Sequence, residues 1–159
     1  MIDKNALVLT KSQNRSRCDE GSYGVVFFEG EHAIKVFRRK QGRADEIARE
    51  TFRNEVSAYE IAMSEPEILN NVPKFLGMVS VEKIINEEGR DVSEEFYLDC
   101  AYKMERINGR FVKGIPPELQ GVVEKFKSKG IVRCSDISYV QTEEGRYVLV
   151  DFSVKELLI

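Results

Sequence analysis

Residues 20–38 read EGSYGVVFFEGEHAIKVFR, and this stretch decides the fold. Two runs rich in β-branched and aromatic residues flank the short EGEH segment, which predicts two antiparallel strands joined by a tight turn. Lys35 stands between Ile34 and Val36 in the second run, whose apolar members are expected to be buried. Because burying an ammonium costs several kcal/mol unless a negative group meets it, the stretch predicts an acidic partner elsewhere in the chain.

The acidic partner is expected in the next segment, residues 44–63. Its apolar residues recur at helical spacing and form one stripe, which predicts a helix of about five turns. Glu55 flanks this stripe, whereas Glu46, Glu50 and Glu60 fall on the outer side. Glu55 is therefore the best candidate to meet Lys35. The alternative, which this observation taken singly favours, is a partly exposed lysine in an ordinary structural ion pair.

The rest of the chain reads as further strands and one more helix. Apolar runs rich in β-forming residues, together with turn signals, predict strands at 6–10, 22–28, 33–37, 72–85 and 94–105. Pro116 and Pro117 suit the start of a helix that ends at Gly130, and residues 138–153 read as two short strands around the turn TEEG. This order predicts an α+β fold that begins with an antiparallel five-stranded sheet.

The composition narrows the class of protein. With 159 residues, 42% of them hydrophobic, the chain can form one compact domain, and its formal net charge of −3 lacks the basic field that nucleic-acid binding uses. One histidine and three cysteines make zinc sites and Ser-His or Cys-His catalysis unexpected. The absence of a bilayer-length apolar stretch or a signal-peptide core predicts a soluble, cytoplasmic protein without membrane contact.

A series of segments resembles the protein kinase superfamily. In order, they are GSYGVV (21–26), AIKVF (33–37), NEVSAY (54–59), VPKFLGMV (72–79), AYKMERINGR (101–110), SKGIV (128–132) and YVLVDFS (147–153). A glycine-rich loop followed by valine, a strand lysine, a helix glutamate and a D-F-G motif occur in this order in kinases. The resemblance implies a kinase-like N-lobe over residues 1–105 with an αC-like helix, followed by a hinge and a much reduced C-lobe over 106–159.

The resemblance also implies that the chain binds ATP and Mg²⁺. Gly21 and Gly24 would let the loop backbone approach the phosphates, and Lys35, paired with Glu55, would contact the α- and β-phosphates. Asp151 would hold Mg²⁺ across the β- and γ-phosphates. The remaining nucleotide contacts that it implies are Val26 and Ala33 beside the adenine, Met104 as the gatekeeper, and the hinge from Glu105 to Ile107.

The catalytic loop departs from the kinase pattern. Residues 128–136, SKGIVRCSD, are similar to the kinase segment, but Cys134 and Ser135 replace its His and Arg and one residue is extra. In this register Asp136 becomes the catalytic Asp. Gln141 falls where kinases have a metal-binding Asn, and its longer side chain fits that role less well.

A second register of the same loop stays open. Counting back from Asp151 without a gap places Arg133 and Ser138 at the catalytic positions, which leaves the loop without a base. The first register is preferred, because a shortened hairpin costs little and Asp136 is the residue there that can carry the chemistry. The serine of DIS, Ser138, also resembles RIO-type and small-molecule kinases.

The function implied by the resemblance is that of a minimal serine/threonine kinase-like phosphotransferase, in which Lys35, Asp136 and Asp151 act on ATP and an acceptor hydroxyl. The alternative is a pseudokinase, a binding module for a protein and perhaps a nucleotide. The chain ends shortly after DFS, which implies C-lobe faces that a protein partner, a substrate or a second copy would cover. Minimal kinases among pathogen effectors make a secreted protein that acts in a host cytosol the alternative to a cytoplasmic one.

Overall fold

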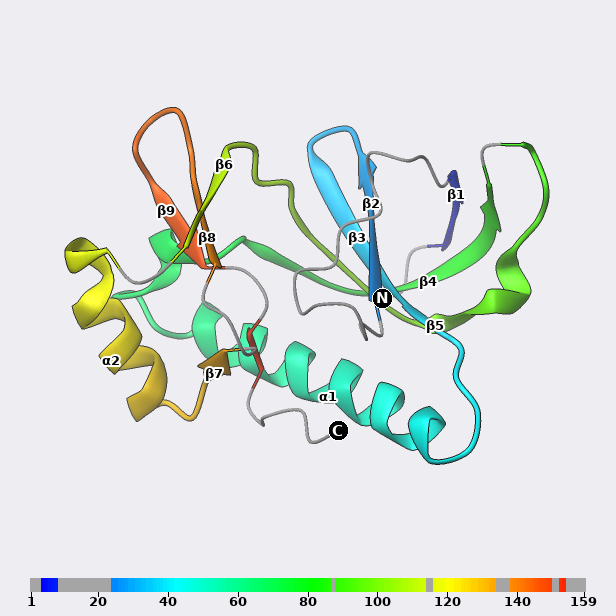
Figure 1. Cartoon of the computed structure of the whole chain (residues 1–159), viewed down its shortest axis with the longest axis horizontal. Helices are drawn as coiled ribbons and strands as arrows, with labels where there is room; N and C mark the ends of the chain where they lie inside the picture. Colours follow the sequence, from blue (N-terminus) through cyan, green and yellow to red (C-terminus); the bar gives the residue numbers. More distant parts are fainter. Residues whose placement is uncertain are drawn as a thin grey trace.

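The computed structural model describes residues 4–8, 24–86, 88–113, 116–133, 138–149 and 152–153. They form a sheet that packs on a long helix, followed by a smaller unit of short strands and a second helix (Figure 1). The α+β class predicted from the sequence is confirmed.

The main sheet has the strand order β1-β4-β5-β3-β2. Its strands are β1 (Lys4–Val8), β2 (Gly24–Glu29), β3 (His32–Arg38), β4 (Phe75–Ile85) and β5 (Phe96–Glu105). Four of them pair antiparallel, but β1 runs parallel to β4. The prediction of five antiparallel strands is therefore wrong. A run of β-forming residues indicates a strand but not its direction. The long stretch of chain between β1 and β4 leaves room for the connection that a parallel pair requires.

The long helix α1 (Arg43–Met63) packs against this sheet. Its buried residues follow the predicted stripe, and Glu55 is buried with them. Glu46, Glu50 and Glu60 are exposed, as predicted. None of the helices within the described ranges is both long and apolar enough to span a bilayer.

The smaller unit follows β5 and contains a second, three-stranded sheet. Its order is β6-β8-β9, formed by β6 (Arg110–Lys113), β8 (Ser138–Gln141) and β9 (Tyr147–Leu149). Helix α2 (Gln120–Ser128) lies between β6 and β8 in the chain, and the predicted helix at 116–130 is confirmed.

The remaining described elements are short. Strand β7 (Val132–Arg133) pairs with β10 (Phe152–Ser153), which lies against α1. Short 3₁₀ helices η2 (Leu69–Asn71), η3 (Ser93–Glu95) and η4 (Pro117–Leu119) complete the described elements.

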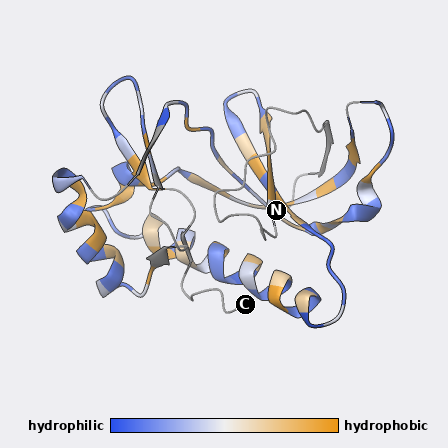
Figure 2. Ribbon diagram, viewed as in Figure 1, coloured by the Kyte–Doolittle hydropathy of each residue, from blue (hydrophilic) through white to orange (hydrophobic). Residues whose placement is uncertain are grey.

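Two apolar clusters lie on the two faces of the main sheet. One lies between the sheet and α1 and continues through Phe126 of α2 to Tyr139 and Leu149 of the smaller unit, so a shared core joins the two parts. The other cluster, which includes Phe27, Ile34 and Val36, lies on the opposite face. Figure 2 shows apolar residues along the central strands and hydrophilic residues at the loop tips. Burial of the apolar face is what drives these layers together.

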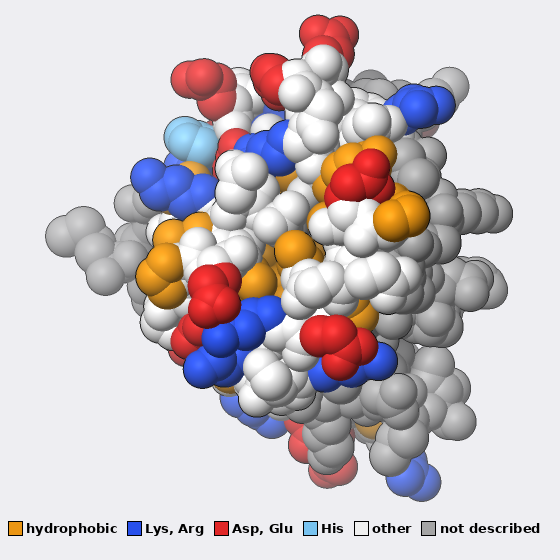
Figure 3. All heavy atoms as spheres, turned by 90° about the vertical axis from the view of Figure 1, so that its left-hand side faces the viewer, with side chains coloured by type: hydrophobic (Ala, Val, Ile, Leu, Met, Phe, Trp, Pro, Cys, Tyr) orange, Lys and Arg blue, Asp and Glu red, His pale blue; other side chains and the backbone are white. Residues whose placement is uncertain are grey.

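Ion pairs connect α2 to the turn that follows α1. Lys125 Nζ lies 3.2 Å from Glu67 Oε1, and Lys129 Nζ lies 3.1 Å from Glu65 Oε2. The end of the molecule drawn in Figure 3 carries acidic and basic side chains next to one another. Because these groups are partly exposed, each pair contributes at most about 1 kcal/mol.

Gly109, in the connection between β5 and β6, allows a close approach between backbones. A Cβ atom at this position would lie 2.3 Å from the backbone oxygen of Gln141 and 2.8 Å from its carbonyl carbon. Backbone atoms cannot rotate away as a flexible side chain can. The connection therefore passes β8 only because residue 109 has no side chain.

Gly109→Ala is expected to lower the free energy of unfolding by about 2 kcal/mol, because the added methyl group forces the backbone of β8 to shift. Urea unfolding followed by circular dichroism measures the loss. Gly121→Ala is the matched control: a Cβ there meets nothing within 4 Å, and the residue lies inside α2. It should stabilise the protein by about 0.5–1 kcal/mol. Equal stabilities of the two variants would contradict the proposed clash.

Candidate functional site

A buried ion pair lies between β3 and α1. Lys35 Nζ donates a hydrogen bond to Glu55 Oε1 at 2.9 Å, and the two residues are only 4% and 3% exposed. Among the described residues they are the buried charged side chains. The ammonium also lies 5.3 Å from the centre of the Phe37 ring. The predicted pairing of Lys35 with Glu55 is confirmed.

Strand register places several predicted nucleotide contacts on the same face as Lys35. Val26 of β2 lies opposite Lys35, and Ala33 lies opposite Met104 of β5. Directly opposed residues point to the same side of a sheet, and so do residues two apart along a strand. Val26 and Met104 are partly exposed, whereas Ala33 is buried. The result is a partly open apolar surface that borders the buried ammonium.

Gly24 makes room for the lysine side chain. A Cβ at this position would lie 2.4 Å from Cε of Lys35 and within about van der Waals distance of its stem, so the aliphatic stem passes directly over the glycine. Gly24 was predicted to let the backbone approach a phosphate. Its closest neighbour in the structure is instead the lysine that would hold the phosphate. The other loop glycine, Gly21, lies outside the described residues.

The predicted gatekeeper Met104 and the predicted hinge residues Glu105 and Ile107 are positioned in three different ways. Met104 accepts a hydrogen bond from the Tyr59 hydroxyl at its sulfur, at 3.3 Å, which holds it toward α1. The Glu105 N–H donates to the Lys74 carbonyl at 2.8 Å. Within the described part of the chain, the backbone of Ile107 makes no hydrogen bond. Of these three, Ile107 therefore has the backbone best suited to receive a ligand.

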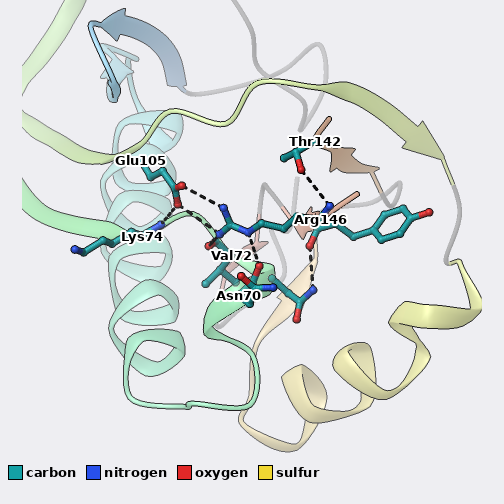
Figure 4. A network of polar contacts seen from close by, with 8 residues as sticks. Asn70, Val72, Lys74, Glu105, Thr142 and Arg146 are labelled. Atoms are coloured by element: carbon teal, nitrogen blue, oxygen red, sulfur yellow. Dashed lines mark hydrogen bonds and ion pairs between the residues drawn. The ribbon is translucent and has the colours of Figure 1, made fainter. Parts of the chain in front are cut away.

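The Glu105 side chain belongs to a polar network centred on Arg146, in the turn between β8 and β9 (Figure 4). The guanidinium donates to Glu105 Oε2 at 3.1 Å, to the Asn70 carbonyl at 2.6 Å and to the Val72 carbonyl at 3.1 Å. We call these contacts the Arg146 clasp. They connect the smaller unit to the end of β5 and to the segment that precedes β4.

The clasp also changes the acidity of Glu105. Burial by itself raises the pKa of this carboxyl, but the hydrogen bonds from Arg146 and from the Lys74 N–H outweigh burial, so the pKa lies below its ordinary value. Lys74 N–H donates to Glu105 Oε1 at 3.0 Å. Glu105 is thus held ionised by its protein neighbours.

The predicted catalytic and metal-binding residues are only partly described. Asp136 and Asp151 lie outside the described residues, as do Cys134 and Ser135. The residues that follow Asp151 form β10, which lies against α1. Gln141 ends β8 in the small sheet; its amide oxygen accepts from Arg110 Nη2 at 3.0 Å and its amide nitrogen donates to the Tyr147 hydroxyl at 3.3 Å. A metal at Gln141 would have to share this oxygen with the guanidinium of Arg110, whose positive charge opposes a nearby cation.

Two tyrosines of β5 make contacts that sequence reasoning missed. Tyr102 donates to Glu55 Oε1 at 2.6 Å, so it shares the oxygen that Lys35 uses. Tyr97 donates to Asp45 Oδ1, near the start of α1, and this bond holds the pKa of Asp45 below its ordinary value. The sequence signal that could have identified Tyr102 is its position two residues before Met104, because residues two apart along a strand lie on the same face of the sheet. That signal becomes readable only when the register between β3 and β5 is known.

Tyr97 also orders the basic turn between β3 and α1. Its hydroxyl accepts from the Lys40 N–H at 2.9 Å, and the guanidinium carbons of Arg39 and Arg49 lie 5.0 and 4.3 Å from the centre of its ring. Burial raises the pKa of Tyr97, and the bond to Asp45 raises it further. The turn is therefore anchored to β5 at a distance along the strand from the Lys35–Glu55 pair.

Comparisons with protein-family models, with curated proteins and with solved structures found no match to this chain.

Proposed function

We propose that this chain is a kinase-like phosphotransferase that binds ATP with Mg²⁺ and transfers the γ-phosphate to a hydroxyl group. The observation that carries the proposal is the buried Lys35–Glu55 pair, at 2.9 Å, on the sheet face that also presents Val26 and Met104. Kinases use such a strand lysine and helix glutamate to hold the α- and β-phosphates. The order of the other motifs along the chain supports the same assignment.

The energetics of the pair favour a functional role. A buried ion pair adds little net stability, because desolvation offsets most of the attraction, and apolar residues of similar size often do as well. Glu55 compensates the charge of Lys35 and holds its ammonium through a hydrogen bond of 2.9 Å. A lysine held in this way is buried and oriented toward the position that a phosphate group would take.

The described residues fit the organic part of the ligand. The apolar side chains of Val26, Ala33 and Met104 suit one face of a purine, and the Ile107 backbone can hydrogen-bond its edge. Lys35 would hold the phosphates. Mg²⁺, when bound, would neutralise charge between the β- and γ-phosphates, and Asp151 is the residue proposed to hold it.

A second candidate function is a binding module that engages nucleotide without transferring phosphate. The observation that favours it concerns Gln141, whose amide oxygen is already bonded to Arg110 and whose amide nitrogen is bonded to Tyr147. A site without a second metal ligand would retain phosphate binding by Lys35 and lose much of the catalytic power of the metal.

The test is autophosphorylation with labelled ATP and Mg²⁺. The parent should incorporate label, and Lys35→Met and Asp151→Ala should each reduce incorporation at least about tenfold, as expected when a charge-stabilising group is lost. Lys83→Met, at an exposed position of β4, is the control and should retain the label. Circular dichroism verifies that each variant is folded.

The same proteins distinguish the two candidate functions. Thermal stabilisation of the parent by Mg-ATP, lost in Lys35→Met and unaccompanied by label, would support the binding module. Neither label nor stabilisation in the parent would reject both.

A further inference from the structure

Tyr102 and Lys35 bind the same carboxylate oxygen from the same sheet. The Tyr102 hydroxyl lies 2.6 Å from Glu55 Oε1, and Lys35 Nζ lies 2.9 Å from that atom. Tyr102 is directly opposite Lys35 in the β3–β5 register and is 2% exposed. We infer that Tyr102 is a positioning residue, which holds the Glu55 carboxylate, and through it the Lys35 ammonium, in the phosphate-binding arrangement before any ligand arrives.

The ring of Tyr102 cannot easily move its hydroxyl. Phe52 and Tyr59 of α1 lie 6.4 and 5.3 Å from it, centre to centre, and Phe75 of β4 lies 5.9 Å away. Such ring pairs prefer defined separations and angles, which stabilises the position of the Tyr102 ring. The packed ring therefore fixes the position of the hydroxyl, and the hydroxyl in turn holds Glu55 Oε1.

The arrangement connects α1 to the sheet at the position of the ion pair. Both donors come from the sheet and the acceptor comes from the helix. A shift of α1 away from the sheet would break both bonds at once and leave a carboxylate and an ammonium buried without them, which is unfavourable. The pair consequently forms in the unliganded protein, with no modification or activating partner required. This inference rests on the proposed function for its consequence, because the arrangement matters only if Lys35 receives a phosphate.

The chain contains a matched control for Tyr102. Tyr97 lies on the same strand, is also buried, and its hydroxyl likewise donates to a carboxylate of α1, that of Asp45. It does not touch Lys35 or Glu55 in the contacts of the described residues. Tyr97→Phe therefore removes a buried hydroxyl from the same strand, together with its bonds to Asp45 and to the Lys40 backbone, without acting on the ion pair.

The first readout compares the affinities for Mg-ATP and for adenosine by titration calorimetry. Tyr102→Phe should weaken Mg-ATP binding about tenfold, as expected for one lost hydrogen bond to a charged group, and leave adenosine binding unchanged. Tyr97→Phe should not alter the ratio of the two affinities. An unchanged ratio in Tyr102→Phe, when the parent binds both ligands, would overturn the inference.

The second readout needs no nucleotide. The unliganded proteins are treated briefly with an amine-acylating reagent, and the modification of Lys35 relative to the other lysines is measured by mass spectrometry. Tyr102→Phe should raise the relative modification of Lys35 roughly tenfold. The lost hydrogen bond to Glu55 lowers the free energy of the local opening that exposes the Lys35 amine. Tyr97→Phe, which controls for a general loss of stability, should leave it near the parent value.

The two readouts separate the possible failures. Unchanged Lys35 modification in Tyr102→Phe overturns the positioning role, whatever the protein binds. Raised modification in a protein that binds neither Mg-ATP nor adenosine supports the positioning role and rejects the proposed function.

Discussion

Glu55→Leu is expected to lower the free energy of unfolding by about 3–5 kcal/mol, the range measured when one partner of a buried ion pair is removed. The substitution leaves the Lys35 ammonium, 4% exposed, without its carboxylate, and it also removes the acceptor of the Tyr102 hydroxyl. The loss of a charged hydrogen-bond partner inside the core is one of the mechanisms that produce such large losses. Urea unfolding, followed by circular dichroism because the chain has no tryptophan, measures the change.

Two further variants make this result interpretable. Lys35→Met combined with Glu55→Leu should recover most of the lost stability, because the double variant buries no charge. Glu60→Leu, on the exposed side of the same helix, should change stability by less than about 0.5 kcal/mol. A Glu55→Leu protein as stable as the parent would show that the pair is not buried in solution.

Arg146→Ala is expected to cost about 3 kcal/mol of stability, because the Arg146 clasp includes an ionised carboxylate and two backbone carbonyls. Removal of the guanidinium leaves the partly buried Glu105 without its counter-charge and the Asn70 and Val72 carbonyls without this donor. The same unfolding measurement applies. The lost contacts also join the smaller unit to the main sheet, so β8 and β9 should show the earliest increase in amide hydrogen exchange.

Two control variants separate the effect of the Arg146 charge from the effect of its planar shape. Arg146→Lys retains the charge but lacks the planar fork that reaches several acceptors, and it should restore only part of the stability. Arg90→Ala, at an exposed position, should be nearly neutral. Loss of stability in Arg90→Ala equal to that in Arg146→Ala would attribute the effect to net charge and contradict the clasp.

Acid provides a further check on the clasp. The folded-state pKa of Glu105 lies below its ordinary value of 4.5, so its contribution to stability is fully present above that pH. This contribution is lost as the pH falls from there through the folded-state pKa. The parent should therefore lose more stability than Arg146→Ala as the pH is lowered below 4.5. Parallel losses in the two proteins would argue against ionised Glu105 as the partner of Arg146.

Local patterns in the sequence were sufficient for most elements of the fold. The β-branched and aromatic runs in residues 24–38 and the helical stripe in 44–63 are formed by neighbouring residues, and they correspond closely to β2, β3 and α1. The parallel direction of β1 and the existence of β6 were not predicted. Strand pairing depends on partners far away in the chain, and a four-residue strand such as β6 is too short to show a period.

The sequence by itself determined that a buried Lys35 needs a carboxylate and made Glu55 the best candidate, because a charge inside an apolar strand must be compensated and Glu55 flanks the apolar stripe of the following helix. Only the tertiary structure decided that Tyr102 shares this carboxylate, that the stem of Lys35 fills the space above Gly24, and that Arg146 holds Glu105. The reason is physical. These contacts depend on the register between strands and on the packing of a distant turn. Many long-range contacts together set that register and packing, and no pattern among neighbouring residues reveals them.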